Sequence, residues 1–198
     1  MSRNVHPIEV ESYRILRRMV DLSHLGPLSK AVAERVIHAS ADPEYADSLV
    51  LDETALHEGY DALNEGALIV ADVRMVAAGV TSREARCFVS DERARKLASE
   101  AGITRSAAGF RVAYEEVGEG AVWVVGNAPT ALFELISLQA KPALVVGLPV
   151  GFVGAAESKE ALIQSGLPSL ANVGMKGGSA VAAAAVNALL YYAGDEAR

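Results

Sequence analysis

The stretch that decides the fold class is an uninterrupted apolar run between two glycines, Ala121-Val122-Trp123-Val124-Val125. Residues 67–71 and 143–146 form two more such runs, which follow a glycine and a proline. All are short and contain several β-branched side chains. Continuous apolar runs of this kind are typical of parallel strands buried on both faces. They predict a parallel sheet covered by helices on both sides.

The segments between the runs have the apolar spacing of helices. Helices are expected at residues 54–64, 91–101, 106–117, 129–139, 158–165 and 178–192, and weaker strands at residues 86–89 and 169–172. Alternation of strands and helices is typical of doubly wound sheets. We predict an α/β fold with three αβα layers, Rossmann-like, around a mainly parallel central sheet.

A helical hairpin is expected before the sheet. Its first helix begins near Pro7, a residue that the first turn tolerates. A buried stripe on that helix is predicted at Val10, Tyr13, Leu16 and Val20. The second helix begins near Leu28 and is ended by Asp42-Pro43. No repeat or linker divides the chain, so residues 1–198 are expected to form a single domain.

Composition limits the classes of function. The chain is 51% hydrophobic and carries a net charge of −7, which argues against nucleic acid as a partner. An anionic ligand would need locally placed Arg, Lys and backbone N–H groups. The one cysteine, Cys87, excludes an intramolecular disulfide and is expected to be a buried structural thiol. No apolar run is long enough to span a bilayer, and a cytoplasmic protein without membrane contact is expected.

His38 is the strongest candidate for acid–base chemistry. It lies beside the apolar stripe of the second helix, with Glu34 and Arg35 as helical neighbours. The unperturbed pKa of histidine, about 6.5, allows proton exchange near neutral pH. The alternative is a histidine that bonds a free carbonyl at the helix end. Spacing alone does not decide between the two.

Glycine-rich loops follow the strands, where ligands bind in open α/β sheets. Gly147, Gly151 and Gly154 do not have the G-x-G-x-x-G spacing, and Lys176 precedes its glycines, unlike the lysine of a phosphate loop. No nucleotide cofactor is therefore expected. The helix start at Gly178 suits an anion, but ordinary turn and cap chemistry explains these glycines equally well.

The sequence lacks the motifs of other catalytic classes. Arg105 stands at the start of a helix, where it can clamp a carboxylate or simply face solvent. The four histidines are scattered without metal-ligand spacing, so no metal site is expected. No G-x-S-x-G elbow of a serine hydrolase occurs. The residues alone thus indicate an α/β domain with a glycine-lined crevice and one acid–base histidine.

A family resemblance extends this interpretation. The strings that carry it are Val36-Ile37-His38-Ala39, residues 71–81, Thr104-Arg105-Ser106-Ala107-Ala108, residues 126–132, residues 147–159 and Gly177-Gly178-Ser179-Ala180. Together they closely resemble the precorrin-8X methylmutase (cobalt-precorrin-8 methylmutase) family of cobalamin biosynthesis. The resemblance runs from about Pro7 to Leu190, nearly the whole chain.

The resemblance implies a reaction and its acid. An isomerase of this family moves a methyl group within ring C of precorrin-8X to give hydrogenobyrinate, or of cobalt-precorrin-8 to give cobyrinate. No cofactor, redox step or external methyl donor takes part. The family's essential histidine matches His38, which is then the proton donor that promotes the shift. Whether the metal-free or the cobalt-bearing tetrapyrrole is the natural substrate stays open.

The resemblance also implies binding residues and a partner. The family's substrate-contacting serine matches Ser12, and its carboxylate-binding arginine matches Arg105. Further substrate-binding candidates are Asp72, Thr81 and Asn127 on the matching loops, and Lys176, which stands just before the Gly-Gly-Ser-Ala string where family members vary. The family is homodimeric with active sites at the subunit interface, and the same is expected here.

The sequence leaves three alternatives. A non-catalytic corrinoid-binding protein or chaperone on the same fold would have no need of an acid, and the presence of His38 argues against it. A phosphate- or nucleotide-using enzyme would require the missing glycine fingerprint. A purely structural interaction domain would leave the polar loop residues unexplained.

Overall fold

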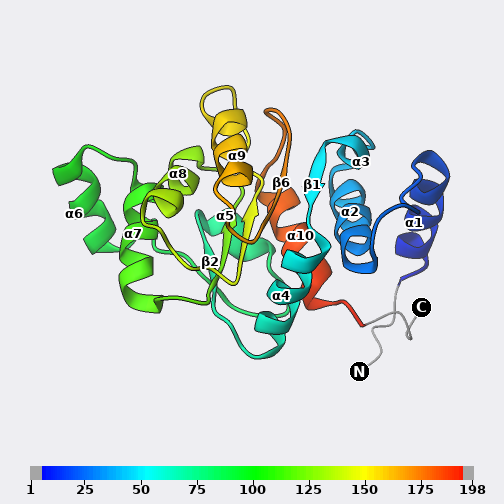
Figure 1. Ribbon diagram of the computed structural model, residues 1–198, viewed down its shortest axis with the longest axis horizontal. Helices are drawn as coiled ribbons and strands as arrows, with labels where there is room; N and C mark the ends of the chain where they lie inside the picture. The colour runs from blue at the N-terminus through cyan, green and yellow to red at the C-terminus, as the bar shows by residue number, and fades with distance from the viewer. Residues whose placement is uncertain (1–5, 194–198) are drawn as a thin grey trace.

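A computed structural model describes residues 6–193 and shows helices on both faces of one sheet (Figure 1). The ends of the expected domain 1–198 lie outside the described residues. The sheet has six strands in the order β1-β6-β5-β4-β2-β3. They are β1 (Leu49–Leu51), β2 (Ile69–Ala71), β3 (Ala85–Arg86), β4 (Val122–Val125), β5 (Leu144–Gly147) and β6 (Ser169–Asn172). Only the pairing of β1 with β6 is antiparallel, so the predicted mainly parallel α/β sheet is confirmed.

The helices divide between the two faces of the sheet. One face carries α1 (Pro7–Met19), α2 (Pro27–Ser40), α4 (Glu53–Asn64), α5 (Arg74–Gly79) and α10 (Ser179–Leu190). The other carries α6 (Glu92–Ala101), α7 (Arg105–Val117), α8 (Pro129–Ser137) and α9 (Ala155–Gln164). The short helix α3 (Tyr45–Ser48) leads into β1. Figure 1 shows α6 and α7 at one end of the molecule and α1 at the opposite end.

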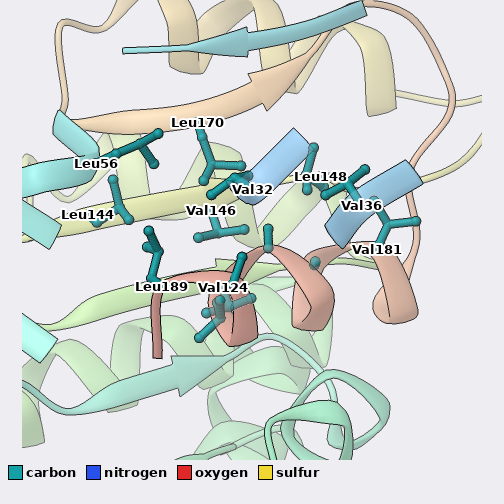
Figure 2. Packing of buried hydrophobic residues seen from close by; sticks show 14 of the residues in the cluster. Val32, Val36, Leu56, Val124, Leu144, Val146, Leu148, Leu170, Val181 and Leu189 are labelled. Carbon is teal, nitrogen blue, oxygen red and sulfur yellow. The ribbon is translucent and has the colours of Figure 1, made fainter. Parts of the chain in front are cut away.

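The apolar runs form strands because both of their faces are buried. Along β4, Val122 and Val124 pack into the cluster on the α10 side, whereas Trp123 and Val125 pack into the cluster on the α7 side. Figure 2 shows the α10 side, where Val124 joins residues of the neighbouring strands and of the covering helices. This alternation is the period-2 pattern of a strand in the middle layer.

The strand expected at residues 86–89 was confirmed only at its start, since β3 covers Ala85–Arg86. The other expected elements were confirmed with small shifts at their ends, and three elements were missed. These are α3, β1 and α5, which have 4, 3 and 6 residues. They are too short to show an apolar period, and β1 is an edge strand that is only partly buried.

Two expectations about burial were wrong. Val10, expected in the buried stripe of the first helix, is 55% exposed because α1 has only one side covered, by α2. Cys87, expected to be buried, is partly exposed. Among the described residues, no helix combines the length and apolarity that a membrane crossing requires.

Candidate functional site

The hairpin of α1 and α2 brings His38 and Ser12 together. His38 lies in the last turn of α2, and its Nδ1 is 2.8 Å from the Oγ of Ser12 on α1. Glu53 contributes to this placement, since its carboxylate accepts the N–H groups of Leu28 and Ser29, each at 2.8 Å, in the first turn of α2. Two of the residues that the family resemblance assigns to the active site, His38 and Ser12, are therefore direct partners.

A tyrosine that the sequence analysis named only for the buried stripe of the first helix stacks on the histidine. The ring of Tyr13 stacks on the imidazole of His38 with centroids 4.9 Å apart and planes 8° from parallel. The guanidinium groups of Arg17 and Arg35 lie 5.9 and 5.8 Å from the centre of the same tyrosine ring. Such stacking restricts the rotation of both rings.

Carboxylates hold these arginines in place. Arg17 makes a two-pronged pair with Glu34, at 2.7 and 2.9 Å, and the Glu34 side chain is almost fully buried. Arg35 pairs with Glu9 at 3.1 Å. The hydrogen bond with Glu34 raises the pKa of the Arg17 guanidinium. The sequence placed Glu34 one turn before His38 but contained no signal that it would be buried and paired.

A cavity of about 140 Å³ opens between the hairpin helices beside His38. Its lining consists of Ser12, Ile15, Leu16, Met19, Val20, Ile37, His38, Ala41 and Pro43. The wall is mostly apolar, with the serine hydroxyl and the imidazole as its polar groups. A flat apolar ring with a reactive edge could enter such a cavity.

Lys176 lies near the rim of this cavity. Its Nζ is 2.7 Å from Oδ2 of Asp42 and 2.5 Å from Oε2 of Glu44, on the segment that follows α2. These hydrogen bonds raise the pKa of the Lys176 ammonium and lower that of the Asp42 carboxyl. The ammonium, expected to bind substrate, is thus held by two carboxylates of the protein.

A second group of predicted residues lies where β2 and β4 end. The carboxylate of Asp72 accepts three backbone N–H groups, from Gly126 at 3.2 Å, Asn127 at 2.8 Å and Ala128 at 2.7 Å. Asp72 is buried, and burial raises the pKa of its carboxyl although the three N–H groups oppose the shift. The residue therefore shapes the loop that presents Asn127, whose side chain is exposed.

Arg105 lies close to this second group. It is the first residue of α7, and the preceding Thr104 bonds the hydroxyl of Thr130, in the first turn of α8, at 2.7 Å. Asn127 comes just before α8. The exposed Arg105 side chain and the Asp72–Asn127 loop therefore share one edge of the sheet.

Thr81 forms a third location at the end of α5. Its hydroxyl is 2.9 Å from that of Tyr191, and its N–H donates to Oδ1 of Asn187 at 3.2 Å. Asn187 also donates to the carbonyl of Gly79 at 2.7 Å. The last helix thus sets the position of Thr81, an arrangement that needed a contact across more than 100 residues.

One chain does not bring all the candidates together. His38 belongs to the face of the sheet that carries α2, whereas Arg105 belongs to the face that carries α7 (Figure 1). Within residues 6–193, no group of three or more His, Cys, Asp or Glu side chains could hold a metal ion. The arrangement offers a proton at His38 and hydrogen bonds or charge at Ser12 and Arg105.

Comparison with known proteins identifies the class. The profile of the precorrin-8X methylmutase family matches residues 7–192. The chain is 44% identical to the cobalt-precorrin-8 methylmutase of Salmonella typhimurium, covering 93% of this chain and 94% of that protein. It is 42% identical to the precorrin-8X methylmutase of Pseudomonas aeruginosa, covering 94% and 95%.

A solved structure of a family member has the same fold. The precorrin-8X methylmutase of Thermus thermophilus superimposes with a TM-score of 0.84 at 36% identity, covering 92% of this chain and 93% of that one. The fold and these matches define an isomerase of cobalamin biosynthesis. The chain belongs to the precorrin-8X methylmutase family.

Proposed function

We propose that the protein moves a methyl group within ring C of precorrin-8X to give hydrogenobyrinate, or of cobalt-precorrin-8 to give cobyrinate, with His38 as the proton donor. The observation that carries the proposal is the His38–Ser12 pair, 2.8 Å apart on the wall of a cavity in a chain of this family. Relatives named for each of the two substrates match over more than nine tenths of the chain, at 44% and 42% identity, so both tetrapyrroles are candidates.

The geometry suggests how the proton moves. In the imidazolium form, Nδ1–H donates to the hydroxyl of Ser12, which leaves the proton on Nε2 for transfer to the macrocycle. Protonation draws electron density from the ring and promotes the methyl shift. Loss of a ring proton to Nε2 afterwards restores the imidazolium, so no proton is consumed. General acid catalysis of this kind contributes about 10²–10⁴-fold to a rate.

The acetate and propionate groups of the tetrapyrrole need hydrogen-bond donors. We assign their binding to Ser12, Arg105, Thr81 and Asn127. Asp72 contributes through the loop 126–128 that it holds, and Lys176 through the rim of the His38 cavity. The net charge of −7 disfavours long-range attraction of a polyanion, so local donors must supply the binding energy.

A second copy of the chain completes the site in this proposal. The cavity beside His38 holds about 140 Å³, whereas pockets for drug-sized ligands hold about 300–1,000 Å³, and a tetrapyrrole is larger still. His38 and Arg105 also lie on opposite faces of the sheet within one chain. A homodimer whose active sites lie at the interface brings such groups to one ligand.

An absorbance titration with hydrogenobyrinate, the stable product, tests the assignment. Wild-type protein is expected to show a saturable spectral shift at one corrin per subunit. His38→Ala should bind hydrogenobyrinate but lose turnover of precorrin-8X by at least about 100-fold. His24→Ala, which replaces an exposed histidine outside the hairpin helices, is the matched control and should behave as wild type.

Each outcome has a clear meaning. Absence of corrin binding by the wild type would contradict the proposal. Binding without turnover by the wild type would favour a non-catalytic corrinoid carrier. Full turnover by His38→Ala would remove His38 from the role of proton donor.

A further inference from the structure

A buried lysine on α9 is bonded to the loop that follows β6. The Lys159 side chain is 1% exposed, and its Nζ lies 3.0 Å from Oδ1 of Asn172 and 2.5 Å from the carbonyl oxygen of Lys176. In residues 6–193, no carboxylate forms an ion pair with it. Burial lowers the pKa of its ammonium to about 8.

Stability alone does not explain a lysine at this position. A buried ammonium without a counter-charge carries an unfavourable desolvation energy that amide and carbonyl oxygens only partly offset. A methionine of similar length would fill the same space without this penalty. What a methionine could not do is donate hydrogen bonds to the loop of residues 173–178.

That loop is held from two sides. The Lys176 carbonyl accepts a second hydrogen bond, from Nδ2 of Asn172 at 3.0 Å. On the other side, the N–H of Gly151 donates to the Met175 carbonyl at 3.2 Å. Lys159 thus supplies one of the donors that fix the main chain around Lys176.

The next residue, Gly177, limits the backbone conformations that the loop can adopt. Gly177 has a φ of +156°, and a Cβ there would overlap the carbonyl oxygens of Leu148 and Pro149. The following N–H, of Gly178, donates to the Leu148 carbonyl at 2.9 Å. A shift of the Lys176 carbonyl would therefore have to move the start of α10 or the loop after β5.

The side chain of Lys176 connects this loop to the His38 cavity. Its ammonium binds Asp42 and Glu44, and the residues interleaved with them, Ala41 and Pro43, line the cavity. A continuous set of contacts thus runs from Lys159 through Lys176 to the rim.

We propose that Lys159 is a positioning residue for the methyl-migration reaction: it holds the Lys176 carbonyl so that the Lys176 ammonium fixes residues 41–44 beside His38. The inference rests on the proposed function, since it assigns binding of the tetrapyrrole to the His38 cavity. Lys159 itself does not touch substrate and acts only through the loop.

The experiment compares Lys159→Met, Lys176→Met and the double variant. For Lys159→Met we expect the Kd for hydrogenobyrinate and the KM for precorrin-8X to rise about tenfold, the effect of one lost charge-assisted hydrogen bond, while kcat stays within about threefold. Because both residues act through the same contacts, the double variant should bind no more weakly than Lys159→Met. Lys96→Met, which replaces an exposed lysine on α6, is the matched control.

Hydrogen exchange supplies a measurement that does not depend on the tetrapyrrole. Lys159→Met should speed exchange of the Gly151 and Gly178 amides, because the Gly151 N–H donates to the Met175 carbonyl of the braced loop and the Gly178 N–H belongs to that loop. Lys176→Met should leave the Gly178 amide protected, since it keeps the carbonyl that Lys159 binds. If Lys159→Met fails to fold, Lys159→Gln takes its place. Glutamine removes the charge but keeps an N–H donor, so we expect the same faster amide exchange to a smaller degree.

The outcomes separate the two hypotheses. Wild-type KM in folded Lys159 variants, or losses of affinity that multiply in the double variant, would overturn the positioning role while leaving the proposed function intact. A wild type that does not bind hydrogenobyrinate would overturn the proposed function itself, and the positioning role with it, even if amide exchange changed.

Discussion

Ser12 determines which nitrogen of His38 can exchange a proton. The 2.8 Å contact occupies Nδ1, and the parallel ring of Tyr13 limits rotation of the imidazole. These two neighbours come from one turn of α1, so the hairpin orients the histidine as well as carrying it. A histidine that only closed the end of a helix would not need either of them.

Replacing Ser12 tests this orientation. Ser12→Ala removes the hydroxyl, and we expect kcat for precorrin-8X to fall about tenfold, the equivalent of one hydrogen bond. The Kd for hydrogenobyrinate should change less than kcat. Ser99→Ala, on the exposed side of α6, controls for serine removal. Unchanged kcat in Ser12→Ala would show that the contact does not orient the acid.

Lys159 should give stability an unusual pH dependence. Its folded pKa of about 8 lies below the ordinary value of 10.5. Between these pH values the unfolded chain binds more protons than the folded one, so stability rises with pH through this window. The total contribution is about 3 kcal/mol at most.

Urea unfolding at pH 7 and pH 10 measures this effect. As the pH rises, the free energy of unfolding of wild type should increase relative to that of Lys159→Met. The other titrating groups are common to both proteins and cancel in this comparison. A free energy of unfolding of wild type that stays constant or falls relative to that of Lys159→Met between pH 7 and pH 10 would contradict a depressed pKa.

Helix α2 needs support at its first turn because it begins after Gly26, which provides no side-chain cap. Glu53, from the start of α4, supplies that support through the N–H groups of Leu28 and Ser29. Burial raises the pKa of Glu53, but the hydrogen bonds from Ser29 and Leu28 together lower it more. The element that carries His38 is thus held at its far end by a residue of another helix.

Glu53→Ala should lower the free energy of unfolding by about 1–2 kcal/mol at pH 7. Since the folded pKa lies below the ordinary value of 4.5, the contribution is complete above pH 4.5 and is lost as the pH falls through the folded pKa. The difference between wild type and variant should therefore shrink in acid. Glu58→Ala, exposed on the same helix, should show no such pH dependence.

At the scale of the molecule, α1 is the least covered helix of the hairpin. It packs on α2 and leaves Ile8 73%, Ile15 48% and Met19 62% exposed, at the seven- and four-residue spacing of one helix face. Apolar side chains gathered in this way are typical of an interface. They lie on the helix that also carries Ser12, which agrees with the proposed dimeric site.

Ile8→Asp tests the dimer. Sedimentation should show a dimer for wild type and a shift to monomer for Ile8→Asp, because an unpaired carboxylate would be buried in the interface. Turnover should fall with the dimer fraction. Ile163→Asp, a matched change on the exposed side of α9, should remain dimeric. A monomeric and fully active wild type would contradict the proposed shared site. The expected cytoplasmic location stays a prediction.

The family strings and apolar runs allowed the α/β class, the parallel sheet, the hairpin and the family to be predicted from the sequence. The strand at residues 122–125 shows as a continuous apolar run and the helix that carries His38 as an apolar period. Both patterns are local and can be found by inspection of a single chain. Family resemblance placed both His38 and Ser12 in the active site, but their hydrogen bond was not predicted, since no spacing rule joins residues 26 positions apart.

Only the tertiary structure decided what each polar side chain binds. It showed Lys176 held by Asp42 and Glu44, Asp72 held by backbone amides, and Lys159 buried without a carboxylate. These contacts join segments up to 134 positions apart. The sequence alone determined which elements form because backbone preference and apolar period act locally. The partners of buried charges depend on how those elements pack, which local sequence does not encode.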